Sequence, residues 1–230
     1  MQIEISEFKE GARQAKGLTV IIDVFRAFSV ECYAFDSGVS RIIATGDPEE
    51  AKRLKEKYPG SLLAGERYES KIPGFDLGNS PTEILKCDLS GKTLIHTTSA
   101  GTAGLVSAVN ADLIITGSLV NASAVARFIA ERRPGHVSLV AMGFRASVSA
   151  EEDLLCAEYI KSQLEGREGN FDNRIAGLRH TAGQRFFNPE NIDFSPPTDF
   201  FLCTKKDRFN FVLNAERRND GNIDLRRTDF

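Results

Sequence analysis

The stretch LTVIIDV, residues 18–24, decides the fold class. It is β-branched and almost wholly apolar, which predicts a central strand that is covered on both faces. The next segment, RAFSVECYAFDSG (26–38), places Phe28, Cys32 and Phe35 at helical spacing. A buried strand that is followed directly by a helix indicates the start of a βαβ unit, from which parallel sheets are built.

The same alternation continues along the chain. Further strands are predicted at VSRIIAT (39–45), SLLA (61–64), KTLIH (92–96), DLIIT (112–116) and VSLVAM (137–142). Further helices are predicted at DPEEAKRLKEKYPG (47–60), AGLVSAVN (103–110), the segment that ends at Arg133, and EEDLLCAEYIKSQLEG (151–166). Strands and helices at this spacing predict a three-layer αβα fold of the α/β class, with a mainly parallel sheet.

The pattern weakens from about Gly166 onward. The segment DFFLCTKKDRFNFVLNAE (199–216) is typical of a hairpin with KKDR (205–208) at its turn. We expect this hairpin to be either an antiparallel addition to the edge of the sheet or a small lobe. The length of 230 residues predicts a single domain over 1–230, with 166–230 as a candidate C-terminal sub-lobe.

The charge balance limits the kinds of partner. The chain carries 29 Lys and Arg against 32 Asp and Glu, a formal net charge of −3, whereas bulk nucleic-acid binding requires a strong basic field. We expect no nucleic-acid partner, but a small cationic pocket is compatible with this balance. No apolar run approaches the roughly 20 residues of a membrane helix, and the charged start (1–17) lacks the apolar core of a secretory signal. The expectation is a cytoplasmic protein with no membrane partner.

Several common sites are excluded by their missing motifs. The cysteines Cys32, Cys87, Cys156 and Cys203 form no CxxC pair, which excludes a zinc ribbon and a thioredoxin motif. We interpret them as buried apolar residues in a reducing compartment. The sequence also has no HExxH, GxxxxGK[ST] or GxGxxG pattern.

Polar residues gather where the predicted strands end. In open α/β sheets, ligands bind beyond the carboxyl ends of the strands, and these ends meet at one edge. The candidates near this edge are Asp23, Arg26, Glu66, Arg67, Thr97, Thr98, Ser99, Gly101, Thr102, Ser118, Asn121 and Asp153. We therefore expect them to share one site.

The TTSAGT turn and Asp23 can each be explained by a structural role as well as by a role in ligand binding or catalysis. The turn TTSAGT (97–102) joins small residues to the start of a helix, which suits phosphate, but it is equally a tight turn capped by Ser99 or Thr98. Asp23 at a buried strand end needs a cation or an arginine partner. A structural pair of Asp23 with Arg26 is therefore the alternative to a catalytic carboxylate at this position.

The long irregular stretch at 65–81 contains a further candidate, because loops of this length in a compact domain are often functional. Asp76 lies between Gly74 and Gly78, which is ordinary turn chemistry or the setting of an oxygen ligand for a hard cation such as Mg²⁺. Glu66 and Asp153 are further candidate ligands. Asp153 also suits a helix N-terminus electrostatically.

Taken together, the motifs resemble those of the 2-phosphosulfolactate phosphatase family. The matching pieces, in the family's order, are IDVFRAFS (22–29), GER (65–67), GFDLGNSP (74–81), TTSAGT (97–102), GSLVNAS (117–123) and EDLLCAEYI (152–160). Phe25 and Phe28 depart from the family pattern, in which we expect Leu and Thr. A different phosphorylated acid therefore stays open as the substrate.

The resemblance implies a Mg²⁺-dependent phosphatase. The family's reaction is the hydrolysis of 2-phospho-3-sulfolactate to 3-sulfolactate and phosphate, a step toward coenzyme M in methanogens. In this interpretation Mg²⁺ is held, directly or through water, by Glu66, Asp76 and Asp153. Asp23 orients or deprotonates water, binds the metal, or forms an aspartyl-phosphate. The expected ligands of the anionic substrate groups are Arg26, Arg67, the TTSAGT turn, Ser118 and Asn121.

Two other classes of function remain as hypotheses. One is a non-catalytic protein that binds an anion or metabolite in the same pocket. The other is a phosphoryl or sulfonyl transferase on the same fold. The sequence also leaves open whether the protein is a homo-oligomer.

Overall fold

The computed structural model describes residues 1–230, which form one ten-stranded mixed sheet with the strand order β1-β8-β2-β7-β9-β10-β3-β6-β4-β5. The strands are β1 (Gln2–Glu7), β2 (Leu18–Ile22), β3 (Arg41–Ala44), β4 (Leu62–Arg67), β5 (Ser70–Lys71), β6 (Thr93–Thr97), β7 (Leu113–Gly117), β8 (His136–Ala141), β9 (Phe211–Arg217) and β10 (Ile223–Asp229). The α-helices are α1 (Phe8–Gln14), α2 (Ala27–Asp36), α3 (Pro48–Lys57), α4 (Pro81–Ile84), α5 (Gly101–Ser107), α6 (Ala122–Arg132), α7 (Glu151–Leu164), α8 (Phe171–Gly177) and α9 (Pro197–Cys203).

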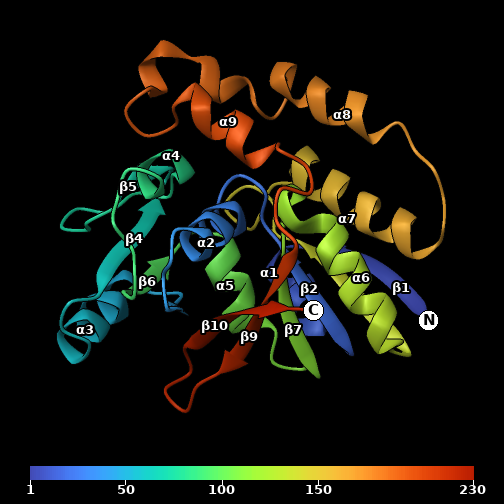
Figure 1. Ribbon diagram of the computed structural model, residues 1–230, viewed down its shortest axis with the longest axis horizontal. Helices are drawn as coiled ribbons and strands as arrows, with labels where there is room; N and C mark the ends of the chain where they lie inside the picture. The colour runs from blue at the N-terminus through green and yellow to red at the C-terminus, as the bar shows by residue number, and fades with distance from the viewer.

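Helices cover both faces of the sheet (Figure 1). The helices α1, α2 and α5 pack on one face, in a core that includes Ile21 and Phe28. The helices α6, α7 and α8 pack in a second core with Ile22 and Phe128. Ile21 and Ile22 are neighbours in β2 and serve opposite cores because successive strand residues point to opposite faces. The predicted three-layer αβα fold with a mainly parallel sheet is confirmed.

The strand β2 occupies the interior of the sheet, as its apolar sequence predicts. All of its residues from Leu18 to Ile22 are buried, and Val20 is paired in parallel register with Ile115 of β7 and Leu139 of β8. A strand with helices on both faces and neighbours on both sides holds mainly apolar side chains, and Thr19 is the one polar residue of β2. The first position at which a carboxylate can leave this core is the strand end, at Asp23.

The expected place of the C-terminal hairpin is wrong. The strands β9 and β10 lie in the middle of the sheet, where β9 pairs antiparallel with β7 and β10 pairs antiparallel with β3. Their turn lies near Gly221, and residues 205–208 instead form the connection that follows α9. Val212 and Leu213 are both fully buried, in opposite cores, and a strand that is apolar on both faces fits the interior of a sheet.

The true edge on the side of β8 is β1, which the sequence analysis does not predict. Its residues are largely polar and only partly buried, so it lacks the apolar pattern of the interior strands. Its backbone still pairs in parallel register with β8 along the whole strand.

None of the helices has the length and the apolar composition that a membrane span requires.

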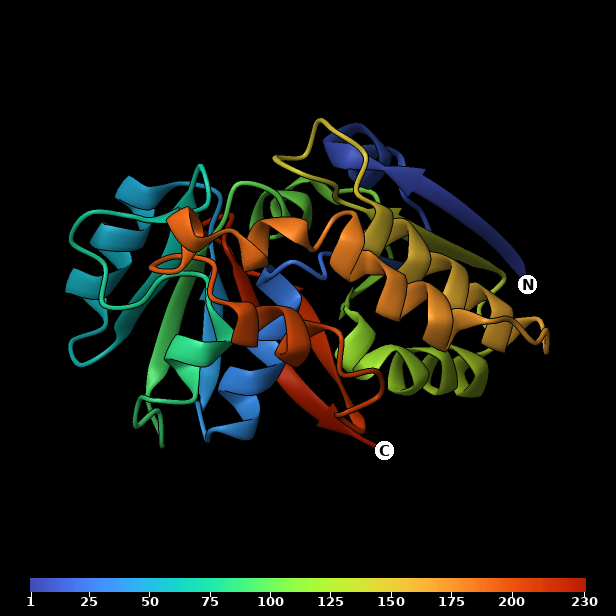
Figure 2. The same cartoon turned by 90° about the horizontal axis from the view of Figure 1, so that it is seen from above.

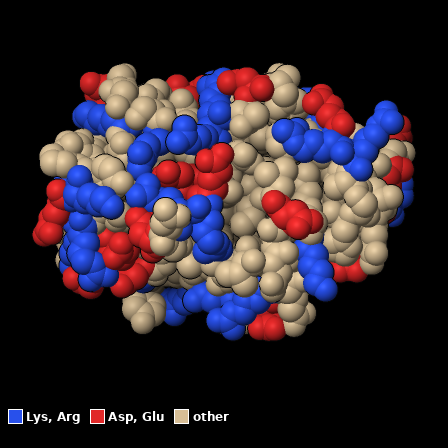
Figure 3. All heavy atoms as spheres, turned by 90° about the horizontal axis from the view of Figure 1, so that it is seen from below, with Lys and Arg blue, Asp and Glu red and all other residues tan.

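The segment that contains α8 and α9 passes over one end of the sheet, as Figure 2 shows from above. The short 3₁₀ helices η2 (Leu178–His180), η3 (Gln184–Phe187) and η4 (Pro189–Asn191) lie between these two helices. The segment brings Arg185 to the carboxyl ends of β2 and β4, where it lines a pocket. On the opposite side of the molecule, acidic and basic side chains are interspersed (Figure 3).

Candidate active site

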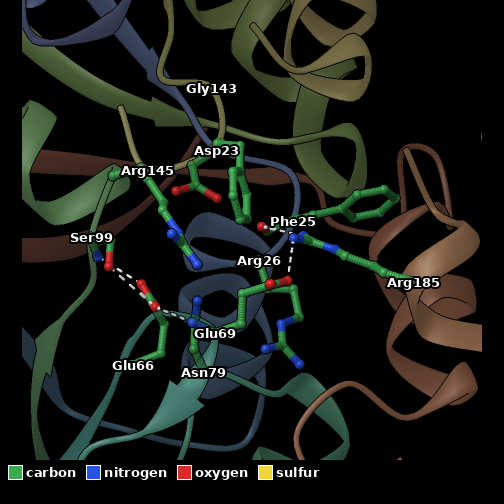
Figure 4. Close-up of a pocket in the computed structure, with 12 residues that line it drawn as sticks. Asp23, Phe25, Arg26, Glu66, Glu69, Asn79, Ser99, Gly143, Arg145 and Arg185 are labelled. Carbon is green, nitrogen blue, oxygen red and sulfur yellow. Dashed lines mark hydrogen bonds and ion pairs between the residues drawn. The ribbon is translucent and has the colours of Figure 1, made fainter. Parts of the chain in front are cut away.

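A pocket opens where β2, β4, β6 and β8 end, and Figure 4 shows the side chains that line it. The lining residues are Asp23, Phe25, Arg26, Glu66, Glu69, Asn79, Ser99, Ala100, Gly143, Phe144, Arg145 and Arg185. The structure therefore brings together four of the predicted site residues, namely Asp23, Arg26, Glu66 and Ser99. The other predicted residues lie around this pocket or away from it.

Asp23 follows the last residue of β2 and is 6% exposed. Its Oδ1 accepts a hydrogen bond from the backbone N–H of Ala27 at 3.0 Å. Burial raises the pKa of Asp23 to about 6; the Ala27 hydrogen bond opposes this rise and the charge of Glu66 adds to it. At pH 7.5 such a carboxylate is still ionised but is a better proton acceptor than an ordinary aspartate. Asp23 is thus the group in this pocket that is best suited to move a proton.

Gly101 fits closely against Asp23. A Cβ at position 101 would lie 2.8 Å from Asp23 Oδ2 and 2.7 Å from the Cβ of Ala27. Gly101 was expected to bind the substrate as part of the TTSAGT turn. The structure shows close approach to the Asp23 carboxylate, so the glycine sets the position of that side chain.

We expect Gly101→Ala to lower kcat on a phosphoester by about 100-fold, because a displacement of about 1 Å of a reacting group has an effect of this size. The added methyl group should also destabilise the fold by about 1–3 kcal/mol through overpacking. Gly177→Ala is the matched control, since a Cβ there meets no atom within 4 Å. Activity and thermal unfolding of both variants measure the effect, and a Gly101→Ala enzyme with normal activity would contradict it.

Arg26 does not pair with Asp23. Its Nη1 donates to Asp199 Oδ2 at 2.7 Å and to the backbone oxygen of Phe194 at 2.5 Å. Asp199 also accepts hydrogen bonds from Ser80 Oγ at 2.8 Å and the Thr82 backbone N–H at 3.0 Å. The structural alternative, an Asp23–Arg26 pair, is wrong, and Arg26 instead ties the start of α2 to α9.

The TTSAGT turn uses most of its donors within the protein. Ser99 donates to Glu66 through its backbone N–H at 2.6 Å and through its Oγ at 3.2 Å. The backbone N–H of Thr98 donates to Thr102 Oγ1, and that of Thr102 donates to Thr98 Oγ1. Thr97 Oγ1 accepts a hydrogen bond from Arg67. The turn therefore fixes Glu66 and its own shape, and only Ser99 of its hydroxyl residues lines the pocket.

Two of the predicted metal ligands do not line this pocket. Asp76 Oδ2 accepts hydrogen bonds from Lys55 Nζ at 2.5 Å and from the Leu63 backbone N–H at 2.8 Å. Asp153 accepts from the backbone N–H groups of Val24 at 2.7 Å and Gly143 at 2.9 Å. Both oxygens of Asp153 are thus occupied in joining the ends of β2 and β8. Burial raises the pKa of Asp153 well above its usual range.

Ser118 and Asn121 are also absent from the pocket lining. Both are fully buried. Ser118 Oγ lies 2.7 Å from Ser29 Oγ, and the Ser118 backbone N–H donates to Asn121 Oδ1 at 3.0 Å. Asn121 Nδ2 in turn donates to the backbone oxygen of Phe211. These residues hold the start of α6 against α2 and β9, which corrects their predicted role in substrate binding.

The pocket also contains residues that the sequence analysis missed. Arg185 donates to Glu69 Oε1 at 2.5 Å and to the backbone oxygen of Phe25 at 3.1 Å. Arg185 belongs to the segment in which the periodic pattern has weakened, so no sequence signal placed it. Arg145 follows Gly143 in the connection from β8 to α7. Its position shortly after the end of a predicted strand could have identified it as a candidate site residue.

Two carboxylates that line this pocket, Asp23 and Glu66, form no ion pair with a Lys or Arg of the protein. No group of three or more His, Cys, Asp or Glu side chains is arranged to hold a metal. Glu69 is paired with Arg185, which leaves Asp23 and Glu66, whose like charges contribute to the raised pKa of Asp23. Mg²⁺ usually binds through one or two carboxylates, retained water and substrate phosphate. The donor set fits this open coordination and does not fit a closed protein cage.

The fold and the pocket define an α/β protein with a polar, carboxylate-containing and arginine-lined site at the carboxyl ends of its strands. The family model described as 2-phosphosulpholactate phosphatase matches residues 4–217. The chain belongs to this family, as its motifs predicted.

Curated relatives agree with this assignment. A Bacillus subtilis protein named probable 2-phosphosulfolactate phosphatase is 31% identical over 212 residues, covering 90% of this chain and 89% of the relative. Proteins of the same name are 35% identical over 195 residues in Thermoplasma acidophilum, covering 85% and 84%, and 39% identical over 165 residues in Carboxydothermus hydrogenoformans, covering 71% and 68%. The similarity to the Bacillus protein therefore extends over most of both chains.

Proposed function

We propose that this protein is a Mg²⁺-dependent phosphatase that hydrolyses 2-phospho-3-sulfolactate to 3-sulfolactate and phosphate. Membership of the family and the names of the relatives support this reaction. The observation that carries the proposal is the buried Asp23 carboxylate, which faces a pocket with Glu66 and arginines around it. This combination supplies a proton acceptor beside positive charge, which phosphoryl transfer to water requires.

Asp23 is the proposed general base. It takes a proton from the attacking water as the new P–O bond forms. The bond from phosphorus to the ester oxygen breaks with its electron pair left on that oxygen, which takes a proton from solvent to give the hydroxyl of 3-sulfolactate. Asp23 Oδ1 accepts a hydrogen bond from the backbone N–H of Ala27, which fixes its orientation. Arg185 places positive charge on the lining of the pocket, where the phosphoryl oxygens gain negative charge.

Glu66 would hold the Mg²⁺ ion directly, and Asp23 would hold it through a bound water. Glu66 is held by three hydrogen bonds, two from Ser99 and one from the backbone N–H of Glu69. A carboxylate fixed in this way loses little freedom when it binds a cation. When bound, Mg²⁺ would neutralise the charge of the phosphoryl group and of the paired carboxylates.

The test is phosphate release from 2-phospho-3-sulfolactate and from 4-nitrophenyl phosphate. With millimolar Mg²⁺ we expect turnover, and with excess EDTA we expect a loss of at least about 100-fold, since a metal supplies several kcal/mol of charge stabilisation. Added Mg²⁺ should restore the rate, and circular dichroism should show the same fold in EDTA. Full activity in EDTA would contradict the metal requirement. Absence of turnover of both esters with Mg²⁺ would contradict the phosphatase.

A further inference from the structure

A second cavity lies beside the Asp23 pocket. We call it the cationic hollow, defined by Lys9, Arg67, Tyr68, Thr98, Ser99 and Arg145 together with the backbone at Gly46 and Ala103. Its volume is about 260 Å³, and its lining contains three cationic side chains and no Asp or Glu. Ser99 and Arg145 line both cavities, so the hollow adjoins the Asp23 pocket.

The cations of the hollow have no acidic partner. In the Asp23 pocket Arg26 is paired with Asp199 and Arg185 with Glu69. In contrast, Arg67 donates only to the backbone oxygens of Gly46 and Glu66 and to Thr97 Oγ1.

Lys9 and Arg145 form no ion pair and no side-chain hydrogen bond. The guanidinium of Arg145 lies 5.0 Å from the centre of the Tyr68 ring and points into the Asp23 pocket in Figure 4. Arg145 thus lies between the two cavities, while Lys9 and Arg67 line the hollow beside it. Unpaired cations that lie together in this way form an electrostatic site for an anion.

The neighbouring acidic residue leaves the cations available to a ligand. Glu66 directs its carboxylate toward Ser99 and the backbone of Glu69, and it lines only the Asp23 pocket. The carboxylates and the unpaired cations are thus separated between two adjoining cavities. A substrate that carries a phosphoryl group on one carbon and another anionic group on the neighbouring carbon matches this separation.

We propose that the cationic hollow binds the sulfonate of the substrate, one of its two non-reacting anionic groups, while the phosphoryl group lies against Asp23. This assignment rests on the proposed function, because it takes Asp23 as the reacting end. A sulfonate spreads one charge over three oxygens and accepts hydrogen bonds well from guanidinium and ammonium groups. The hollow therefore determines specificity: it favours phosphoesters that carry a second anion.

The experiment compares two substrates in matched variants. We expect Lys9→Met and Arg145→Met each to lower kcat/KM on 2-phospho-3-sulfolactate about 10-fold more than on 4-nitrophenyl phosphate, which lacks a second anion. The double variant should widen this ratio to about 100-fold, with 10-fold corresponding to about 1.4 kcal/mol. Lys205→Met removes the same charge from an exposed lysine outside both cavities and should leave the ratio within twofold of the wild type.

An unchanged ratio in the Lys9→Met and Arg145→Met variants would overturn the proposal, even if both rates fall. If neither ester is hydrolysed, the proposed function fails. Calorimetry with 3-sulfolactate then tests whether the hollow binds a sulfonate. There a tenfold weaker Kd in Arg145→Met supports the sulfonate site, and an unchanged Kd, or no binding to the wild type, overturns it.

Discussion

Replacing Asp23 by asparagine is expected to lower kcat on 2-phospho-3-sulfolactate by about 10³-fold or more. A positioned general base contributes about 10²–10⁴-fold, and the same change removes one of the two carboxylates available to Mg²⁺. The amide cannot accept a proton from water, but it keeps the size of the side chain next to Gly101. Steady-state phosphate release at saturating Mg²⁺ measures the loss.

Asp76→Asn is the matched control for this prediction. Asp76 was a predicted metal ligand, but its carboxylate contacts Lys55 and the backbone of Leu63 outside the pocket. The structure predicts activity within a few-fold of the wild type for this variant. If Asp76→Asn and Asp23→Asn lost activity equally, the site would be assigned to the wrong carboxylate.

The pH dependence of the free energy of unfolding tests whether burial raises the pKa of Asp23. Its folded-state pKa of about 6 lies above the ordinary value of 3.8, so the native state binds more protons than the unfolded state between these values. Metal-free protein should therefore lose stability as the pH rises from about 4 to about 6, by about 2–3 kcal/mol from this group. Asp23→Asn should flatten this decline. A residual decline should remain, because burial raises the pKa of Glu152 to about 7.

The second large effect is expected on stability. Arg26→Met should destabilise the fold by about 3–5 kcal/mol, because it leaves the fully buried Asp199 without its cationic partner. For a chain of this size the melting temperature should fall by about 10 °C. The pair joins α2 to α9. We therefore expect α9 to lose its protection against amide hydrogen exchange before the rest of the fold. Thermal unfolding and amide hydrogen exchange of α9 measure these effects.

Two further variants separate pairing from simple loss of charge. Arg13→Met removes an arginine that is paired with Glu10 on the surface, and such pairs contribute at most about 1 kcal/mol. Adding Asp199→Asn to Arg26→Met should restore part of the lost stability, since no buried charge is then left unpaired. If the double variant were less stable than the sum of the two single changes predicts, the pairing argument would fail.

The sequence predicts the interior of the fold well because its signal comes from burial. The apolar runs at residues 18–24, 112–116 and 137–142 correspond to β2, β7 and β8, each with neighbours on both sides. The edge strand β1 was missed because its backbone pairs with β8 while its side chains stay polar. The place of the hairpin was missed because strand order depends on long-range pairing, which local periodicity does not encode.

The candidate site could be predicted only where chemistry follows a strand end. Asp23, Glu66 and Ser99 were found in this way, and they do line the pocket. Asp153 and Ser118 also follow strand ends, but their side chains hold neighbouring backbone in place. The position of a residue in the chain does not show whether its side chain lines the pocket or is hydrogen-bonded to neighbouring backbone. Arg185 comes from the segment that crosses the sheet, so only the tertiary structure could place it.

Hydrolysis of 2-phospho-3-sulfolactate in ¹⁸O-labelled water with Mg²⁺, followed by mass spectrometry of the released phosphate, tests whether the protein transfers the phosphoryl group to water with the help of Asp23. A phosphatase that acts through Asp23 should place one solvent oxygen in each phosphate formed, and the Asp23→Asn variant should form almost none. Loss of the phosphoryl group to another acceptor without labelled phosphate, or no reaction of the wild type, would contradict the account.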